Sequence, residues 1–217
     1  MSELRNVCAG SFGAIYDYYI EREWLSALVA RVVWGIDMRS MYASMSAIGR
    51  TPEGATILDA PCGGGVAFRA LRDGQRVRYI GVDLAVEMLA RARRRAEERG
   101  LAQIELIQAD MCALPLADAS VDLCLSYSGL HCVADPALAI SELARCLRNG
   151  GVLIGTTFLK TGSRRQRTLL AAGQRRRETG PVGTRQDLHS WLATSGMTAI
   201  DIEHGTGFAL FTARKTN

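Results

Sequence analysis

The sequence lacks the patterns that most directly assign a compartment or a metal. Its six cysteines, at positions 8, 62, 112, 124, 132 and 146, show no C-x-x-C spacing and no paired zinc pattern. Most lie in apolar runs such as "DLCLSYSGLHC", where a free cysteine is usually a small buried side chain. No apolar run approaches the ~20 residues that span a bilayer, and the N-terminus "MSELRNVCAG" lacks the apolar core of a signal peptide. We therefore expect a soluble protein of the reducing cytoplasm.

A large excess of charge of one sign is also missing. The chain of 217 residues carries a formal net charge of +4, which hints at anionic surroundings without requiring them. Its length fits one domain with a small cap, and its hydrophobic share of 48% is ordinary for a globular protein. We expect an N-terminal helical cap over residues 1–50 and one compact domain over residues 51–217.

The period of the apolar residues changes along the chain. Residues 12–48 read as amphipathic helix, and "RTPEG" ends that pattern. From residue 56 onward, strand-like and helix-like segments alternate, which predicts an α/β fold with a mostly parallel sheet covered on both faces. We expect strands at 56–60, 77–83, 103–110, 121–128 and 152–159, helices at 66–74, 86–100, 136–151 and 184–196, and an antiparallel hairpin of 198–203 with 208–214.

Several helix ends are marked in the sequence. Asp135 caps the helix that begins at Pro136, and Gly150 or Gly151 is expected to end it. Thr184 with Asp187 resembles a capping box. In "VEMLARARRRAEERG" the apolar positions Met88, Leu89, Ala92 and Ala96 should face inward and the five arginines mostly outward, with Gly100 as the stop.

A glycine cluster follows the first strand in "ILDAPCGGG". Ligands of such sheets bind at the carboxyl ends of the strands, so this loop should touch one. A dinucleotide site needs a small residue at the third position of G-x-G-x-x-G, where this chain has Phe68, and the P-loop ending G-K-[ST] is absent. The pattern acid-x-G-x-G-x-G fits better, with Asp59, Gly63 and Gly65 in place and Pro61 at the first glycine position.

Two further acids end the next two strands. Asp83 lies 18 residues beyond Gly65 in "GVDLAVEML", where a carboxylate can accept both hydroxyls of a ribose. Asp110 ends the third strand in "IQADMCALPL", where it can accept from an adenine amino group while Met111 offers its amide and an apolar side. One such aspartate is usually a turn residue, but three in order beside a glycine loop indicate a nucleoside-type ligand.

With these motifs the chain resembles the class I S-adenosylmethionine-dependent methyltransferases, and more narrowly the small-molecule branch that includes the methyltransferase type 11 and quinone-biosynthesis enzymes. The resemblance is strong over residues 54–160 and includes "ELARCLRNGGVLIGTT". It implies a Rossmann-like, doubly wound, seven-stranded sheet whose last two strands are the C-terminal hairpin. It also implies S-adenosylmethionine as cofactor, bound by Asp59, Cys62, Gly63, Gly65, Asp83, Leu84, Asp110, Met111, Ser126 and Tyr127.

Methyl transfer from a sulfonium is an in-line displacement, so the enzyme mainly orients two reactants and excludes water. His131 follows the fourth strand in "SYSGLHCVADP" and is the best-placed general base, although a purely structural role is at least as common for such a histidine. The resemblance implies that the N-terminal segment lines the acceptor site, where Tyr16 and Tyr19, with His131, are the expected contacts. These rings favour a flat or apolar acceptor.

The segment 160–184 is strongly basic, with six arginines. It can be a solvated helix face, a lid that draws an anionic acceptor, or a contact for RNA backbone.

Three functions stay open. The leading prediction is a methyltransferase acting on a small, apolar or aromatic, or else anionic, metabolite. The second is an RNA methyltransferase, although the chain has "SYSG" where amino-methylating enzymes place N/D-P-P-Y/F. The third is a nucleotide-binding oxidoreductase or a non-catalytic cofactor-binding module. An arsenic methyltransferase using Cys62, Cys112 and Cys132 is disfavoured because their spacing fits no known pattern. We expect no metal, no membrane span and no nucleic-acid partner, and leave a homodimer open.

Overall fold

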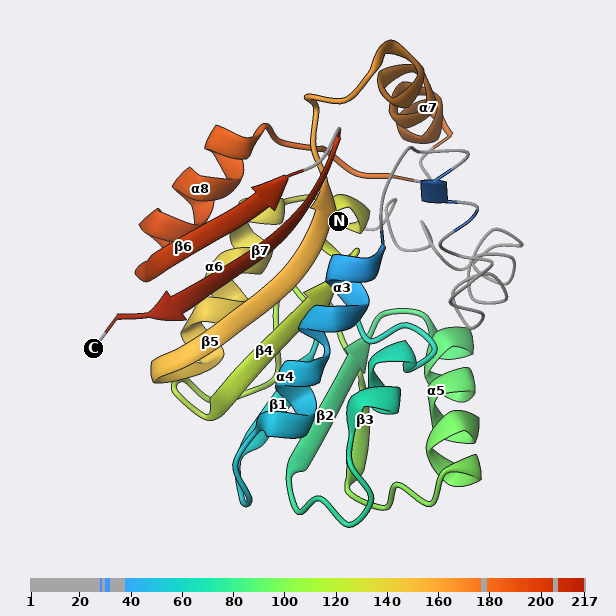
Figure 1. The fold of residues 1–217 in the computed structure, drawn as a ribbon, viewed down its shortest axis with the longest axis vertical. Coiled ribbons are helices and arrows are strands. Elements are labelled where there is room, and N and C mark those ends of the chain that lie inside the picture. Colours follow the sequence, from blue (N-terminus) through green and yellow to red (C-terminus); the bar gives the residue numbers. More distant parts are fainter. Residues whose placement is uncertain (1–27, 29, 32–37, 177–178, 205–206, 217) are drawn as a thin grey trace.

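Seven strands form one mixed sheet in the order β3-β2-β1-β4-β5-β7-β6 (Figure 1). The computed structural model describes residues 28, 30–31, 38–176, 179–204 and 207–216. Neighbours among β1 to β5 pair in parallel, whereas β7 runs antiparallel to both β5 and β6. The doubly wound, seven-stranded fold and its C-terminal hairpin are thereby confirmed. The strands are β1 Thr56–Asp59, β2 Arg78–Asp83, β3 Ile104–Gln108, β4 Val121–Tyr127, β5 Leu147–Phe158, β6 Met197–His204 and β7 Phe208–Lys215.

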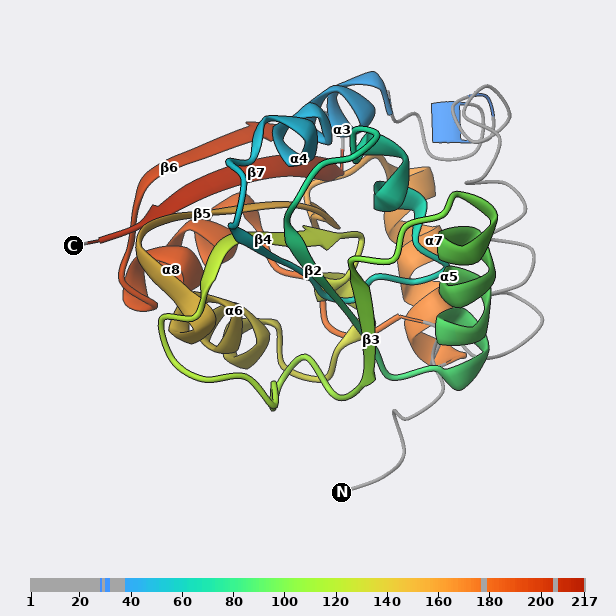
Figure 2. The ribbon, with the colours of Figure 1, turned by 90° about the horizontal axis from the view of Figure 1, so that it is seen from below.

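Helices cover both faces of the sheet (Figure 2). One face carries α3 (Arg39–Ser44), α4 (Ser46–Arg50), the short 3-10 helix η2 (Val66–Ala70) and α5 (Val86–Glu98). The other carries α6 (Pro136–Cys146) and α8 (Arg185–Thr194), while η3 (Leu130–Cys132) follows β4. Helix α7 (Arg164–Arg175) stands apart from both layers, beyond the end of β5 (Figure 1). No helix within the described ranges is long and apolar enough to cross a bilayer.

Each face of the sheet has its own apolar core. Leu58, Ile80 and Cys124 point to the side of α6, where they pack with Leu143 and Phe211. Their chain neighbours point to the opposite side and pack beneath α4 and α5, in a cluster that includes Ile57, Phe68, Tyr79, Leu123 and Leu125. This alternation is what a strand buried on both faces requires.

Most of the predicted helix signals are confirmed. Asp135 accepts from the amide of Leu138 at the start of α6, and Thr184 forms a capping box with Asp187 at the start of α8. On α5 the four expected apolar residues are buried, and Gly100 follows with a positive φ of 64°. The segment at 66–74 is shorter than expected, since η2 ends at Ala70.

The predicted end of α6 at Gly150 or Gly151 is wrong. The helix ends at Cys146, and β5 begins at once with Leu147 paired to Val121. The register then shifts, so that the next pair joins Leu123 to Val152, and Gly150 has a φ of 76°. The two glycines therefore form an irregularity inside β5 instead of a helix stop.

Only the last part of the predicted N-terminal cap is described. There the chain forms α3 and α4, which bury Met41 and Ile48 against the sheet, and α4 ends at Arg50, the first residue of "RTPEG". The predicted acceptor contacts Tyr16 and Tyr19 lie outside the described residues, so this part of the prediction, like the domain boundary at residue 50, stays a prediction.

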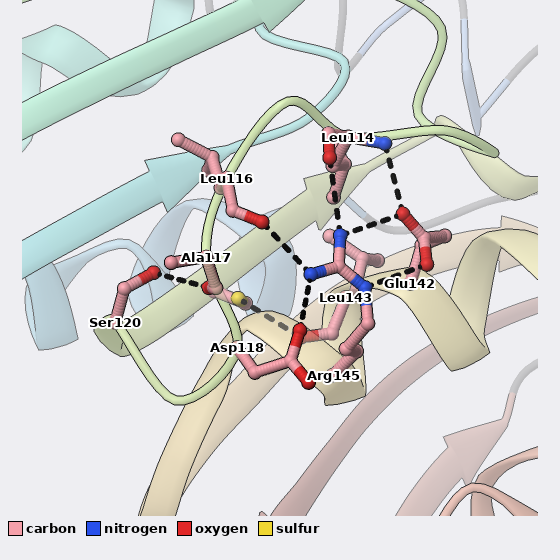
Figure 3. Close-up of polar contacts among 9 residues, drawn as sticks. Leu114, Leu116, Ala117, Asp118, Ser120, Glu142, Leu143 and Arg145 are labelled. Atoms are coloured by element: carbon pink, nitrogen blue, oxygen red, sulfur yellow. Dashed lines mark hydrogen bonds and ion pairs between the residues drawn. The ribbon is translucent and has the colours of Figure 1, made fainter.

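Arg145 fixes the long loop between β3 and β4 to α6 (Figure 3). Its guanidinium donates to the carbonyls of Leu114 (3.0 Å) and Leu116 (2.8 Å) and to the carboxylates of Asp118 (2.6 Å) and Glu142 (2.8 Å). Glu142 in turn accepts from the amide of Leu114 at 2.9 Å. One side chain thus holds the loop that starts at the carboxyl end of β3.

Replacing Arg145 should therefore weaken the fold. Arg145→Ala removes several charge-assisted hydrogen bonds from a side chain that is 30% exposed, and we expect the free energy of unfolding to fall by about 1–3 kcal/mol. Arg148→Ala is the matched control, because its pair with Asp122 is about half exposed (50% for the Arg148 side chain) and should contribute less than about 1 kcal/mol. Urea unfolding measures both, and equal losses in the two variants would contradict the role of Arg145.

Candidate functional site

The predicted site residues meet at one edge of the sheet. Asp59 and Asp83 are the last residues of the neighbouring strands β1 and β2, and Tyr127 is the last residue of β4, which pairs with β1 on its other side. Asp110 follows two residues after the end of β3. Because these strands are parallel, their carboxyl ends share an edge, and the sheet brings the three predicted aspartates to it.

Asp83 holds the start of the glycine loop. One of its carboxylate oxygens accepts from the amide of Gly63 at 2.8 Å and the other from the amide of Ala85 at 2.9 Å. Although it ends a strand, Asp83 is only 8% exposed. The reason is that the loop folds back over the end of β2, where Cys62 also donates its amide to Val82.

The glycines of the loop are needed for its shape. Gly63 and Gly65 have φ values of 52° and 79°, in the left-handed region that favours glycine. A Cβ at Gly65 would stand 2.3 Å from the ring of Phe68, which is fully buried beneath the loop. That ring meets the ring of Tyr79 edge-on, with centroids 5.1 Å apart. Phe68 therefore fills the space that a small third residue leaves open in a dinucleotide site.

Asp59 is buried beneath the loop and is only 2% exposed. It accepts from the hydroxyl of Tyr79 at 2.8 Å. Burial raises the pKa of Asp59 to about 7, the bond from Tyr79 opposes that shift, and the charge of Asp83 adds to it. Near neutral pH this carboxyl group is therefore poised between its two protonation states, and a cation placed beside it would favour the ionised form.

The residues expected to contact an adenine differ in how exposed their side chains are. Asp110 is exposed, and its carboxylate accepts from the amide of Cys112 at 2.8 Å. Met111 is buried among the apolar residues on the α6 side, so only its backbone is available to a ligand at this edge. Leu84 is 39% exposed, which is unusual for a leucine at a strand end and leaves an apolar surface beside Asp83.

The two residues that end β4 differ in the hydrogen bonding of their hydroxyl groups. The Tyr127 hydroxyl lies 3.0 Å from the Ser44 hydroxyl of α3, and burial raises the pKa of Tyr127 to about 12. Ser126 is fully buried, and its hydroxyl has no hydrogen-bond partner among the described residues. A Cβ at Gly129 would approach that hydroxyl to 2.9 Å and the Pro61 ring to 2.1 Å, so the loops after β1 and β4 touch here.

His131 lies at the same edge, in η3. It is 6% exposed, and its Nδ1 has no partner among the described residues. Its ring packs against Phe158 with centroids 4.5 Å apart, and Phe158 packs against Phe208 at 5.7 Å. Burial lowers the pKa of His131 to about 4, so the imidazole is neutral at pH 7. A buried ring nitrogen with no partner among the described residues can accept from, or donate to, one polar group of a ligand.

Sequence reasoning missed the residues that support this edge. Tyr79, Phe158 and Phe208 lie inside strand patterns that looked like ordinary core. Arg95 and Arg99 looked like solvated positions of α5, yet Arg95 donates to the carbonyl of Gly64 and Arg99 to that of Phe68. Both arginines lie on the helix face of the buried Ala92, which was the one available signal. The described residues hold no cluster of side chains suited to a metal ion.

Comparison with known proteins agrees with this geometry. Residues 58–155 match the family model described as "Methyltransferase domain". The chain is 41% identical over 104 residues to the malonyl-[acyl-carrier protein] O-methyltransferase of Enterobacter lignolyticus, covering 48% of this chain and 39% of that protein. It is 38% identical over 103 residues to the demethylmenaquinone methyltransferase of Thermus thermophilus, covering 47% and 46%. This chain spans less than half the length of these curated relatives.

A solved structure shares the fold. The phosphoethanolamine N-methyltransferase 2 of Haemonchus contortus, in complex with S-adenosyl-L-methionine, superimposes with a TM-score of 0.79. The alignment covers 100% of this chain and 61% of that one at 16% identity, so it bears on the fold alone.

Asp59 should make stability depend on pH. Its folded-state pKa of about 7 lies above the ordinary 3.8, so the folded protein binds more protons than the unfolded chain between these values. Stability therefore falls as pH rises from about 4 to 7, by at most about 4 kcal/mol at about 1.4 kcal/mol per pKa unit. Asp59→Asn keeps an oxygen for Tyr79 but cannot ionise, so its stability relative to wild type should increase over this range. The lowered pKa of His131 makes stability rise with pH instead. This contribution cancels when the variant is compared with wild type, because both proteins contain His131. If urea unfolding gave the same pH dependence of the unfolding free energy for wild type and Asp59→Asn, the raised pKa of Asp59 would be contradicted.

Proposed function

We propose that the protein is an S-adenosylmethionine-dependent methyltransferase acting on a small metabolite, and the match of residues 58–155 to the family model described as "Methyltransferase domain" supports this. The observation that carries the proposal is the placement of three carboxyl groups, those of Asp59, Asp83 and Asp110, after three neighbouring parallel strands, with one of them holding an amide of the glycine loop. The buried ring of Phe68 favours this ligand over a dinucleotide, because it fills the position where a pyrophosphate-binding loop has a small residue.

The described residues fit the parts of this cofactor. Asp83 and Leu84 would hold the ribose, Asp110 and the backbone of Met111 the adenine, and the loop from Cys62 to Gly65 the methionine portion. Asp59 would meet the cationic amino group, whose charge would favour the ionised form of this buried carboxyl group. Of the two residues at the end of β4, Ser126 has the hydroxyl without a partner, whereas the hydroxyl of Tyr127 lies against Ser44.

The bound cofactor supplies an activated methyl group, and the chain's own residues orient the acceptor and exclude water. Alignment of two reactants contributes on the order of 7–11 kcal/mol to such a step. His131 would contact the acceptor through its unpartnered Nδ1, with Phe158 beside it. Because this imidazole is neutral and lies against an aromatic ring, an apolar or aromatic acceptor with one polar group suits it better than an anion. Tyr16 and Tyr19 remain proposed contacts from the N-terminal segment.

The acceptors named for the relatives, a malonyl carrier protein and a demethylmenaquinone, differ in chemistry, so the acceptor class rests on the surroundings of His131 alone.

An RNA acceptor is the second candidate. It is favoured by the exposed arginines of α7, namely Arg164, Arg165, Arg167 and Arg175. Binding of tRNA that weakens steeply with salt, together with methyl incorporation into total RNA, would support it.

Asp110 provides a direct test of the adenine assignment. Asp110→Asn keeps an oxygen for the amide of Cys112 but replaces the acceptor for the adenine amino group, and the exposed position should leave stability unchanged. We expect the affinity for S-adenosylhomocysteine, measured by calorimetry, to fall about tenfold, the effect of a lost hydrogen bond to a charged group.

S-inosylhomocysteine is the matched ligand, because it has a carbonyl in place of the adenine amino group. It should bind wild type weakly and gain affinity in Asp110→Asn, whose side-chain amide can donate to that carbonyl. A loss of equal size for both ligands would argue against contact between Asp110 and the adenine.

His131 is tested through turnover. If it is the general base, His131→Gln should lower kcat by roughly a hundredfold or more while leaving cofactor affinity unchanged. The acid limb of the wild-type kcat/KM profile should then lie near pH 4, where burial places its pKa, and not near 6.5. A variant with unchanged kcat but a raised KM for the acceptor would assign His131 to acceptor binding only.

A further inference from the structure

An arginine of α5 and the arginine that caps this helix contact the glycine loop and the helix η2 that follows it. Arg95 donates through Nη1 to the carbonyl of Gly64, and Arg99, one turn later, donates through Nη1 to the carbonyl of Phe68. Arg95 is half-buried in this contact, whereas its neighbour Arg94 is exposed. The same helix thus contains arginines that engage the loop and arginines that face solvent.

Main-chain hydrogen bonds also hold the loop, and one of them joins the amide of Cys62 to the carbonyl of Val82 at 2.8 Å. The loop makes one tight turn, in which Gly65 donates its amide to Cys62 at 3.0 Å, and then enters η2, where Phe68 donates to Gly65 at 3.1 Å. Its glycines have access to a wide range of backbone conformations, so the conformation with positive φ at Gly63 and Gly65 must be selected by external contacts.

Two oppositely charged side chains supply those contacts. The Asp83 carboxylate accepts from the amide of Gly63, and the Arg95 guanidinium donates to the carbonyl of the next residue, Gly64. Because each peptide unit is planar, these two bonds fix the unit before Gly63 and the unit after Gly64. The unit between them, which carries the amide of Gly64, is thereby set in orientation. Charge-assisted bonds of this kind are about twice as strong as neutral ones.

We propose that Arg95 is a positioning residue for the cofactor: it holds the Gly64 carbonyl so that the glycine loop keeps the conformation required by the methionine portion of the cofactor. Arg99 contacts η2, which follows the loop, at the carbonyl of Phe68. This inference rests on the proposed function and deepens it, since it assigns to α5 the control of one end of the ligand only. The adenosine end would be bound instead by Asp83 at the end of β2 and by Asp110 after β3.

Two ligands separate the ends of the cofactor. S-adenosylhomocysteine has both the adenosine and the amino-acid portion, whereas 5′-methylthioadenosine lacks the amino-acid portion. Calorimetric titration of Arg95→Ala should show the affinity for S-adenosylhomocysteine lowered about tenfold and that for methylthioadenosine changed by no more than about twofold. Arg95→Lys keeps a cationic donor and should recover part of the loss. Arg94→Ala, the matched exposed control, should bind both ligands as wild type does.

The outcomes are distinct. An Arg95→Ala protein that binds S-adenosylhomocysteine as tightly as wild type, or that loses affinity for both ligands equally, overturns the positioning role. Wild type that binds neither ligand overturns the proposed function instead. If Arg95→Ala melts below the temperature of the titration, the ratio of the two affinities is measured in Arg95→Gln, whose neutral amide retains side-chain volume and offers a weaker donor; an unchanged ratio there also overturns the proposal.

Discussion

The carboxylate of Asp83 joins three segments of the chain on which the site depends. It lies at the end of β2, accepts from the amide of Gly63 in the loop after β1, and accepts from the amide of Ala85 at the start of α5. Strand, loop and helix are thus fixed to one another at the edge of the sheet where the proposed cofactor would lie. The loop can be rich in glycine because its conformation is set by this contact and, from the outer side, by Arg95.

Burial also controls the protonation of the groups at this edge. Asp59 and Tyr79 form a buried pair in which burial raises the pKa of the carboxyl group toward neutrality, while burial lowers the pKa of His131. Both shifts favour uncharged side chains. A site with few full charges in its interior suits a cofactor that brings its own positive charge and an acceptor without one.

Much of this arrangement could be predicted from the sequence. The strands after residue 56 were readable because apolar runs alternate with helical patterns, and the acids at their ends could be placed at one edge because parallel strands end together. The N-cap at Asp135, the capping box of Thr184 with Asp187 and the stop at Gly100 were readable because their geometry is local. The end of α6 could not be predicted, because the bulge at Gly150 depends on the pairing of β5 with β4. Local residue preferences do not encode that pairing.

The supporting residues of the site could not be read for a related reason. Arg95 lies in the same arginine run as the exposed Arg94, and its contact with the loop depends on how α5 packs beside that loop. The burial of Asp83 likewise follows from the path of the loop over β2 and not from any property of "GVDLAVEML". Side chains that act through long-range contacts become visible only in the folded chain.

The central claim is that an adenosyl ligand lies along the ends of β1, β2 and β3 and over the glycine loop. A crystal structure of the protein grown with S-adenosylhomocysteine tests it most directly. We expect the ribose hydroxyls to lie within hydrogen-bond distance of the Asp83 carboxylate. We expect the amino-acid portion of the ligand to lie against Gly63 to Gly65. A pyrophosphate on the loop, or a site without ligand density at saturating concentration, would contradict it.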